Sequence, residues 1–195
     1  IVWGISPALG VGAATDYRFI IYVSPVGPYF RGGVKMLNLK IEPDFHRAAA
    51  KGIGNAKAIG NYSASLFPLA QAKKEGYDEV IYLDSVTEDR IEEIGSANLF
   101  IYVDGILKTP KVSGSILDGV TRDSVCKIAS EILKLQVEEN DINIKELVEA
   151  DEVFCTGTAV VVAPVGKITY KDMVHEINQN QPGPIASECK NLLTA

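Results

Sequence analysis

The stretch Lys51-Gly-Ile-Gly-Asn-Ala-Lys-Ala-Ile-Gly-Asn-Tyr-Ser-Ala-Ser65 places one lysine, Lys57, among small residues that let a large group approach the backbone. Amide and hydroxyl side chains follow it directly. Apolar residues then recur at helical spacing, which predicts a helix from Ala64 to about Glu75. Gly76 stands where a helix often ends on a glycine.

A lysine at a glycine-rich turn before a helix has two chemical uses besides an ordinary place in a solvated loop. It could hold phosphate, but the P-loop spacing of glycines, lysine and hydroxyl residue is absent. It could instead be a nucleophilic amine that forms a Schiff base, for which a sheltered lysine is suited. Taken alone, this stretch leaves the three interpretations open.

Composition bounds the class of protein. The chain has 195 residues, of which 47% are hydrophobic and 23% charged, enough for one domain with a substantial core. A net charge of -6 argues against non-specific binding of nucleic acid. The three cysteines are too widely spaced for a disulfide framework or a zinc site, and no apolar run is long enough for a bilayer. We therefore expect a soluble intracellular protein without a metal, a nucleic-acid partner or a membrane partner.

Most of the chain alternates between predicted strands and helices. Residues 1–16 are rich in glycine, alanine and proline and are expected to form an extended linker. The β-branched and aromatic run Tyr17–Ser24 predicts a buried strand, and Val34–Glu42 alternates as a second strand. Further strands are predicted at 79–83, 99–103, 136–141, 152–155 and 160–166, and further helices from 121, at 144–150 and at 187–195.

Three short segments offer charged or anion-binding groups. Glu92 and Glu93 point to opposite faces if extended, so we expect one to be solvated and the other to face inward toward a cation. Gly119–Thr121 opens a predicted helix, where free amides bind anions. Thr156–Ala159, between two strands, suits a carboxylate or phosphate, and equally an ordinary polar turn.

Four motifs occur in one order: G-x-G-x-x-K-x-x-G-N-Y from Gly52, E-E-x-G-x-x-N-x-F from Glu92, G-V-T-R-D-S from Gly119 and G-T-A-x-V-V-x-P-V-G from Gly157. With them, residues 1 to about 177 resemble the class IV aminotransferases that use pyridoxal 5'-phosphate, and within these the branched-chain amino acid aminotransferases, plant members above all. The resemblance implies an α/β (mixed α+β) fold. The implied architecture is that of the large C-terminal domain of fold type IV, a curved barrel-like β-sheet surrounded by helices.

The resemblance also implies site residues. Lys57 matches the catalytic lysine, which forms the Schiff base with pyridoxal 5'-phosphate and carries a proton as general acid–base. Glu93 matches the partner of the pyridine nitrogen, and Tyr62 the phenol beside the ring oxygen. The other implied cofactor-binding residues are Arg47, Ser96, Leu117, Gly119, Val120, Thr121 and Thr158. The implied substrate-binding residues are Tyr29, Thr158 and Ala159.

The implied reaction moves the amino group of leucine, isoleucine or valine to 2-oxoglutarate, giving glutamate and a branched 2-oxo acid. The family has two domains and forms homodimers when full length. We therefore expect residues 1–16 to be an interdomain linker or the end of a small domain, and 17–195 to be the large pyridoxal-phosphate-binding domain. We also expect the small N-terminal domain of the family to be absent from this sequence. Plastid, mitochondrion and cytoplasm all fit the family.

Two other functions fit the same residues. The chain could be a catalytically inactive, truncated remnant with a structural or partner-binding role, although retention of Lys57, Tyr62 and Glu93 favours an enzyme. Within the same fold, it could be a D-amino acid aminotransferase or an aminodeoxychorismate lyase, although the loop Ser24–Gly33 favours the branched-chain group. One departure from the family is Asp118, which replaces a common proline and weakens phosphate binding unless it points away.

Overall fold

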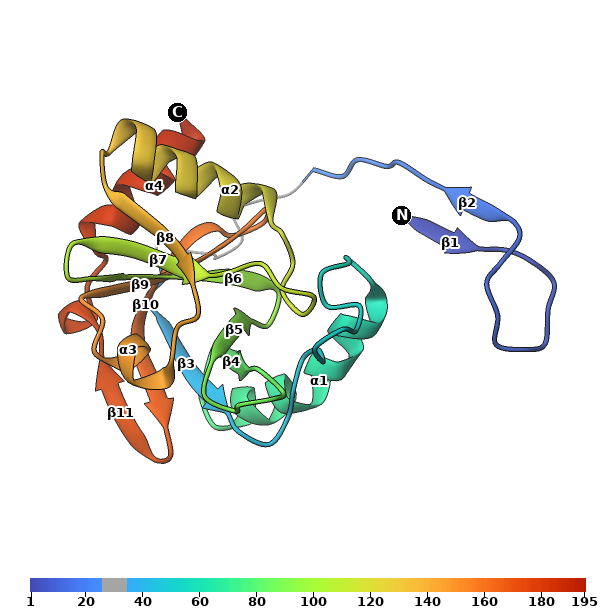
Figure 1. The fold of residues 1–195 in the computed structure, drawn as a ribbon, viewed down its shortest axis with the longest axis horizontal. Coiled ribbons are helices and arrows are strands. Elements are labelled where there is room, and N and C mark those ends of the chain that lie inside the picture. Colours follow the sequence, from blue (N-terminus) through green and yellow to red (C-terminus); the bar gives the residue numbers. More distant parts are fainter. Residues whose placement is uncertain (26–34) are drawn as a thin grey trace.

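A closed ring of six β-strands forms the body of the protein (Figure 1). The computed structural model describes residues 1–25 and 35–195. The ring closes because β9 pairs with β10 on one edge and with β6 on the other. Its strands are β3 (Leu37–Glu42), β4 (Glu79–Leu83), β5 (Ile91–Ile94), β6 (Ala97–Val103), β9 (Glu152–Gly157) and β10 (Val161–Tyr170). The barrel-like sheet expected from the resemblance is therefore confirmed.

Pairing inside the ring is mixed. Strand β3 runs parallel to both β4 and β10, whereas the other four pairs of the ring are antiparallel. The β3–β4 connection is a crossover through α1 (Ile59–Lys74), as parallel neighbours require. Three further strands extend the sheet beyond the ring: β7 (Ile106–Pro110), β8 (Gln136–Asn140) and β11 (Met173–Glu176). The β6–β7 hairpin turns on Asp104 and Gly105, both at positive φ, as the Asp-Gly pair predicts.

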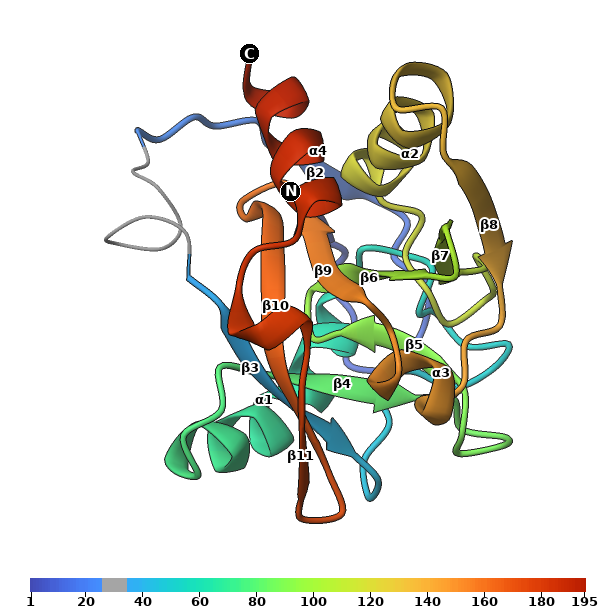
Figure 2. The same cartoon turned by 90° about the vertical axis from the view of Figure 1, so that its left-hand side faces the viewer.

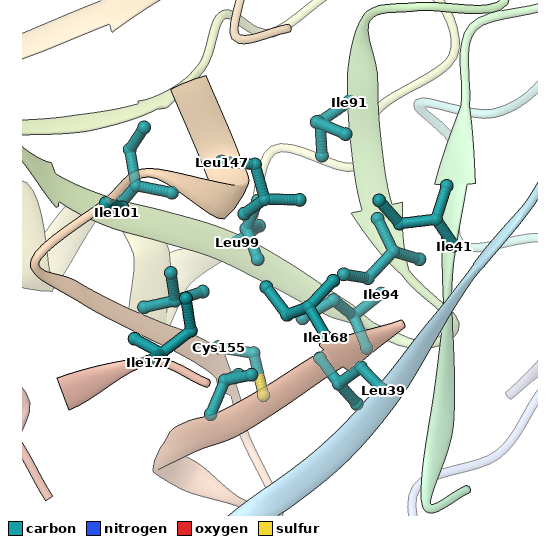
Figure 3. Close-up of a cluster of buried hydrophobic side chains, with 14 of the residues drawn as sticks. Leu39, Ile41, Ile91, Ile94, Leu99, Ile101, Leu147, Cys155, Ile168 and Ile177 are labelled. Carbon is teal, nitrogen blue, oxygen red and sulfur yellow. The ribbon is translucent and has the colours of Figure 1, made fainter. Parts of the chain in front are cut away.

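Aliphatic side chains fill the interior of the barrel (Figure 3). They come from every strand of the ring, so that Leu39, Leu99 and Ile168, from three of the strands, share one cluster. Strand β6 is buried on both faces: Leu99 and Ile101 belong to the interior cluster, and Phe100 between them belongs to a second cluster outside. Side chains alternate along a strand, so a run of apolar residues is buried throughout only when both faces are covered.

Helices cover the outside of the barrel (Figure 2). Over β6 and β9, the second cluster joins α2 (Val120–Lys127), the π-helical turn Ile128–Ile132 and α4 (Pro184–Thr194). Phe100 stacks on Phe154 there, with ring centroids 5.1 Å apart. Helix α1 covers β4, where Ala72 packs with Val80 and Tyr82. The other helical elements are α3 (Ile144–Val148) and the 3₁₀ turn Asn178–Asn180.

The first 25 residues differ from the sequence-based expectation. Strand β1 (Val2–Gly4) pairs with β2 (Tyr17–Phe19) in a separate two-stranded sheet, so the linker predicted for residues 1–16 contains a strand. The buried strand predicted for Tyr17–Ser24 is wrong, because β2 has three residues and all are exposed. Figure 1 shows this hairpin apart from the barrel. An apolar strand is buried only when another layer covers it, and no element described here covers β2.

Other boundaries follow the predictions more closely. The predicted 79–83 strand is β4, and the terminal helix is α4. Helix α1 begins five residues before the predicted Ala64, at Ile59, and ends before Gly76, which has φ +92°. Strands β7 and β11 were not predicted. In residues 1–25 and 35–195, no helix combines the length and apolar character that a bilayer crossing needs.

Candidate active site

The main pocket lies at one end of the barrel, where β3, β4 and β6 begin and β5 and β9 end. Its volume is about 630 Å³. Five of the residues singled out from the sequence line it, and they come from three separate segments: Lys57 and Tyr62 around the start of α1, Ser96 in the β5–β6 turn, and Thr158 and Ala159 in the β9–β10 turn. The fold therefore joins residues that are about 100 positions apart.

The loop before α1 holds Lys57 at this pocket. Asn61, buried in the first turn of α1, donates from Nδ2 to the carbonyl oxygens of Ile53 at 2.9 Å and Ala56 at 2.8 Å. These bonds tie the glycine-rich loop to the helix and account for the early start of α1. The side chain of Lys57 is exposed, and its Nζ lies 5.9 Å from the ring centroid of Tyr62. The amine and the phenol thus face the same space.

A buried ion pair stands beside the pocket. Arg47 Nη2 lies 3.0 Å from Glu93 Oε2, with side chains 5% and 3% exposed. Burial raises the pKa of Glu93 to about 7, while the guanidinium of Arg47, the N–H of Leu117 and the charge of Lys57 act to lower it. Arg47 also donates to two carbonyl oxygens, those of Gly54 at 3.3 Å and Ser115. The inward carboxylate of β5 therefore has the cationic partner that the sequence called for.

The other glutamate of β5, Glu92, is not where the sequence predicted it. Glu92 was expected in solvent if Glu93 faced inward, yet its side chain is buried, with 6% exposed. Both faces of β5 are covered, so alternation along the strand does not bring either carboxylate to water. Ser115 Oγ donates to Glu92 Oε1. The pKa of Glu92 is raised by burial.

Asn98 is a site residue that sequence reasoning missed. Its Nδ2 donates to Glu93 Oε1 at 3.2 Å and to the carbonyl oxygen of Leu117 at 2.8 Å. The N–H of Leu117 donates to Glu93 Oε1 at 2.5 Å. Asn98 thereby fixes both Glu93 and the segment that leads to α2. The available signal was its place in the motif E-E-x-G-x-x-N-x-F, where no role was given to it.

The N-terminus of α2 is open to an anion. Gly119 caps this helix without a side-chain hydrogen bond, which leaves the first amides free. A Cβ on Gly119 would lie 2.2 Å from Asn98 Oδ1, so a larger residue would have to displace the side chain of the asparagine. Val120 is exposed and Thr121 half-buried. Asp118 has 71% of its side chain exposed, and its Oδ1 lies 3.9 Å from Nη1 of the buried Arg122, so its carboxylate has a cationic neighbour.

Some expected site residues stand outside the pocket lining. Among described residues, Glu93, Leu117 and Gly119 border Asn98 rather than the pocket itself. Tyr29, expected in the substrate pocket, lies outside the described residues. In the described ranges, no cluster of three histidine, cysteine or acidic side chains could hold a metal.

The family model for amino-transferase class IV matches residues 1–168. The chain belongs to the class IV aminotransferases. It is 45% identical, over all 195 residues, to the protein named branched-chain-amino-acid aminotransferase 3, chloroplastic, of Arabidopsis thaliana, and spans 47% of that relative. The branched-chain amino acid aminotransferase structure of Escherichia coli superposes with TM-score 0.78 and 33% identity, over 88% of this chain and 55% of that one. The Thermobaculum terrenum enzyme in its PLP form gives TM-score 0.74 and 29% identity, over 83% of this chain and 50% of that one.

The residues of this class IV chain fit pyridoxal 5'-phosphate. The cofactor carries an aldehyde, a basic ring nitrogen and a phosphate. The pocket presents an exposed amine, Lys57, for the first group, and a buried carboxylate, Glu93, stands beside it for the second. The open N-terminus of α2 at Gly119 suits the third. The donor set therefore matches the chemistry of the cofactor group by group.

Proposed function

We propose that this chain is the cofactor-binding part of a branched-chain amino acid aminotransferase, which moves the amino group of leucine, isoleucine or valine to 2-oxoglutarate. One observation carries the proposal: Lys57 and Tyr62 share a pocket with Thr158 and Ala159, next to the buried Glu93. The names of the relatives support the same activity. The chain spans about half the length of those relatives, so the activity of a full-length protein is part of the proposal.

Lys57 is the residue that handles protons in this proposal. Pyridoxal 5'-phosphate, when bound, supplies an aldehyde that accepts amino groups and a ring that withdraws electrons from the neighbouring carbon. The amine of Lys57 would take the proton from the substrate Cα as a general base and hold it for return as a general acid. The flexible side chain of Lys57 suits this movement, since the amine has to leave one partner and reach another.

The other residues of the site would hold the cofactor and polarise its ring. Glu93 keeps a proton on the ring nitrogen, because a cation that enters next to a buried carboxylate is favoured in its charged form. Tyr62 would hold the ring oxygen through its phenol hydrogen, and Leu117 would pack against the ring. The phosphate is assigned to the N–H groups of Gly119, Val120 and Thr121 and to the hydroxyl of Thr158. Arg47 is assigned to a supporting position next to Glu93, and Ser96 to a place near the ring.

The substrate side of the pocket is assigned to the β9–β10 turn. The N–H groups of Thr158 and Ala159 bind the substrate carboxylate, since the single hydroxyl hydrogen of Thr158 is assigned to the phosphate. Apolar side chains of the same pocket, those of Leu37, Ile94 and Val160, suit a branched aliphatic side chain. One methylene is worth only about 1–3 kcal/mol of discrimination, so this lining does not rank the three amino acids.

Two assignments for the whole protein follow from the same proposal. We assign residues 17–195 to the large domain and residues 1–16 to a linker or the end of a small one. The full-length protein is proposed to be a homodimer. An inactive remnant is the less favoured reading, because Lys57, Tyr62 and Glu93 are all retained. D-amino acid aminotransferase or aminodeoxychorismate lyase activity is the other alternative, and substrate assays separate it.

The first experiment is cofactor capture. The chain is mixed with pyridoxal 5'-phosphate and reduced with borohydride, and the modified peptide is found by mass mapping. Lys57→Ala is the test variant, and Lys51→Ala is the matched control, since Lys51 is an exposed lysine of the same loop. Modification confined to Lys57, and unchanged in Lys51→Ala, supports the site. Modification scattered over surface lysines and unchanged in Lys57→Ala refutes it.

A substrate assay then tests the specificity. Leucine, isoleucine and valine are each supplied with 2-oxoglutarate, and glutamate is measured. D-alanine and aminodeoxychorismate serve as the competing substrates. Turnover of the branched L-amino acids alone supports the proposal, whereas turnover of D-alanine or release of pyruvate from aminodeoxychorismate assigns the chain to one of the alternatives.

A further inference from the structure

Glu92 is a buried carboxylate that the proposed reaction leaves without a role. Its side chain is 6% exposed, and Ser115 Oγ donates to its Oε1. Its Oε2 is buried and has no hydrogen-bond partner among the described residues. A carboxylate in this position costs free energy, because one oxygen loses water and gains nothing. A neutral amide would hold Ser115 as well, so the hydrogen bond alone does not account for the charge.

The segment that Glu92 holds is the one that organises the ion pair. The carbonyl oxygen of Ser115 accepts a hydrogen bond from Arg47. Two residues further on, the N–H of Leu117 donates to Glu93. Glu92 therefore acts through Ser115 on both members of the Arg47–Glu93 pair.

Charge supplies the second part of the argument. The guanidinium of Arg47 is paired with Glu93, and its charge also acts to lower the pKa of Glu92. Arg47 and Glu93 alone would form a neutral pair, and a cation beside a neutral pair gains little. With Glu92 included, the three side chains carry a net charge of about -1 when ionised. We propose that Glu92 is a positioning residue of the cofactor site. It holds the Arg47–Glu93 pair through Ser115 and offsets the charge of Arg47, so that the negative charge of Glu93 is available to a protonated ring nitrogen.

This inference rests on the proposed function, and the charged groups around β5 act on both of its carboxylates. Glu92 acts to raise the pKa of Glu93, against Arg47 and Lys57, which lower it. Around Glu92 itself, burial and Asp84 raise its pKa, whereas the hydrogen bond from Ser115 and the charges of Arg47 and His46 favour the ionised form. A like charge raises the pKa of Glu93, and it also favours the protonated form of a ring nitrogen bound next to Glu93.

The test uses three variants. Glu92→Gln keeps the size and the hydrogen bond to Ser115 but removes the charge, Ser115→Ala removes the bond but keeps the charge, and Glu92→Asp keeps the charge on a shorter side chain. Glu88→Gln, at an exposed carboxylate, is the control for loss of one negative charge. The first readout is the pKa of Glu93 in the cofactor-free chain, from ¹³C carboxyl NMR with the signal assigned by Glu93→Gln. The second is the affinity for pyridoxal 5'-phosphate, from an absorbance titration.

We expect Glu92→Gln to lower the pKa of Glu93 by roughly half a unit to one unit and to weaken cofactor binding about fivefold. Glu92→Asp should keep the pKa of Glu93 near that of the parent, and so should Glu88→Gln. An unchanged pKa of Glu93 in Glu92→Gln overturns the inference, as does a Ser115→Ala variant that binds the cofactor as tightly as the parent. If the parent chain binds no cofactor, the proposed function fails for this chain, and the NMR titration still decides the role of Glu92.

Discussion

Replacing Gly54 with alanine should separate the lysine loop from the segment that holds the Arg47–Glu93 pair. A Cβ on Gly54 would lie 2.3 Å from the carbonyl oxygen of Ser115 and 2.5 Å from its Cα. Both atoms are backbone, so no side chain can rotate away. Ordinary contact needs about 3.5 Å, which means that the two segments must part by roughly 1 Å.

The cost has two parts. Overpacking of a buried site costs about 1–3 kcal/mol. A shift of this size also breaks the hydrogen bonds from Arg47 to the carbonyl oxygens of Gly54 and Ser115, and a buried charged donor without its acceptors costs a further 1–3 kcal/mol, roughly. We therefore expect Gly54→Ala to lose about 2–6 kcal/mol of unfolding free energy.

Gly60 provides the matched control. It lies in the first turn of α1, and a Cβ there would meet only Ile53 Cδ1, at 3.7 Å. Gly60→Ala should lie within about 1 kcal/mol of the parent, on the stabilising side, because alanine is the better helix residue. The assay is urea unfolding followed by far-UV circular dichroism, since the single tryptophan, Trp3, stands in the exposed β1–β2 hairpin. Equal midpoints for the two variants would refute the close packing at Gly54.

Three further predictions concern the same region and the C-terminal helix. Glu93 holds its proton more tightly when folded, with a pKa of about 7 against 4.5, so its contribution to stability is lost as pH rises from about 4.5 to about 7. Glu93→Gln should remove this part of the pH dependence, at most about 3 kcal/mol, in urea titrations at pH 5 and pH 8. Gly119→Ala should displace Asn98 and weaken binding of inorganic phosphate, about tenfold, by calorimetric titration; unchanged binding would place the phosphate elsewhere. Glu152 accepts hydrogen bonds from two amides in the first turn of α4, so Glu152→Ala should cost about 1–3 kcal/mol and speed amide exchange there, and equal exchange rates would contradict this.

Local features of the sequence carried over well into the structure. The turn at Asp104 and Gly105 and the helix end at Gly76 were predictable, because each depends on backbone conformations that few residues adopt. The four ordered motifs predicted the family and the barrel-like sheet. They also pointed to Lys57 and Glu93, whose roles stay predictions until cofactor binding is measured.

Burial and long-range pairing were settled only by the tertiary structure. The composition of Tyr17–Ser24 is that of a buried strand, yet β2 is exposed, since nothing in the described part of the chain covers it. Glutamate is usually a surface residue, yet Glu92 is buried because both faces of β5 are covered. Asn98 and Ser115 acquire their contacts from segments about 20 to 70 positions away, and the ring closes only because β9 meets β6 and β10 together. A residue's neighbours in sequence determine its backbone preferences, whereas its neighbours in space determine whether it meets water, a charge or a ligand.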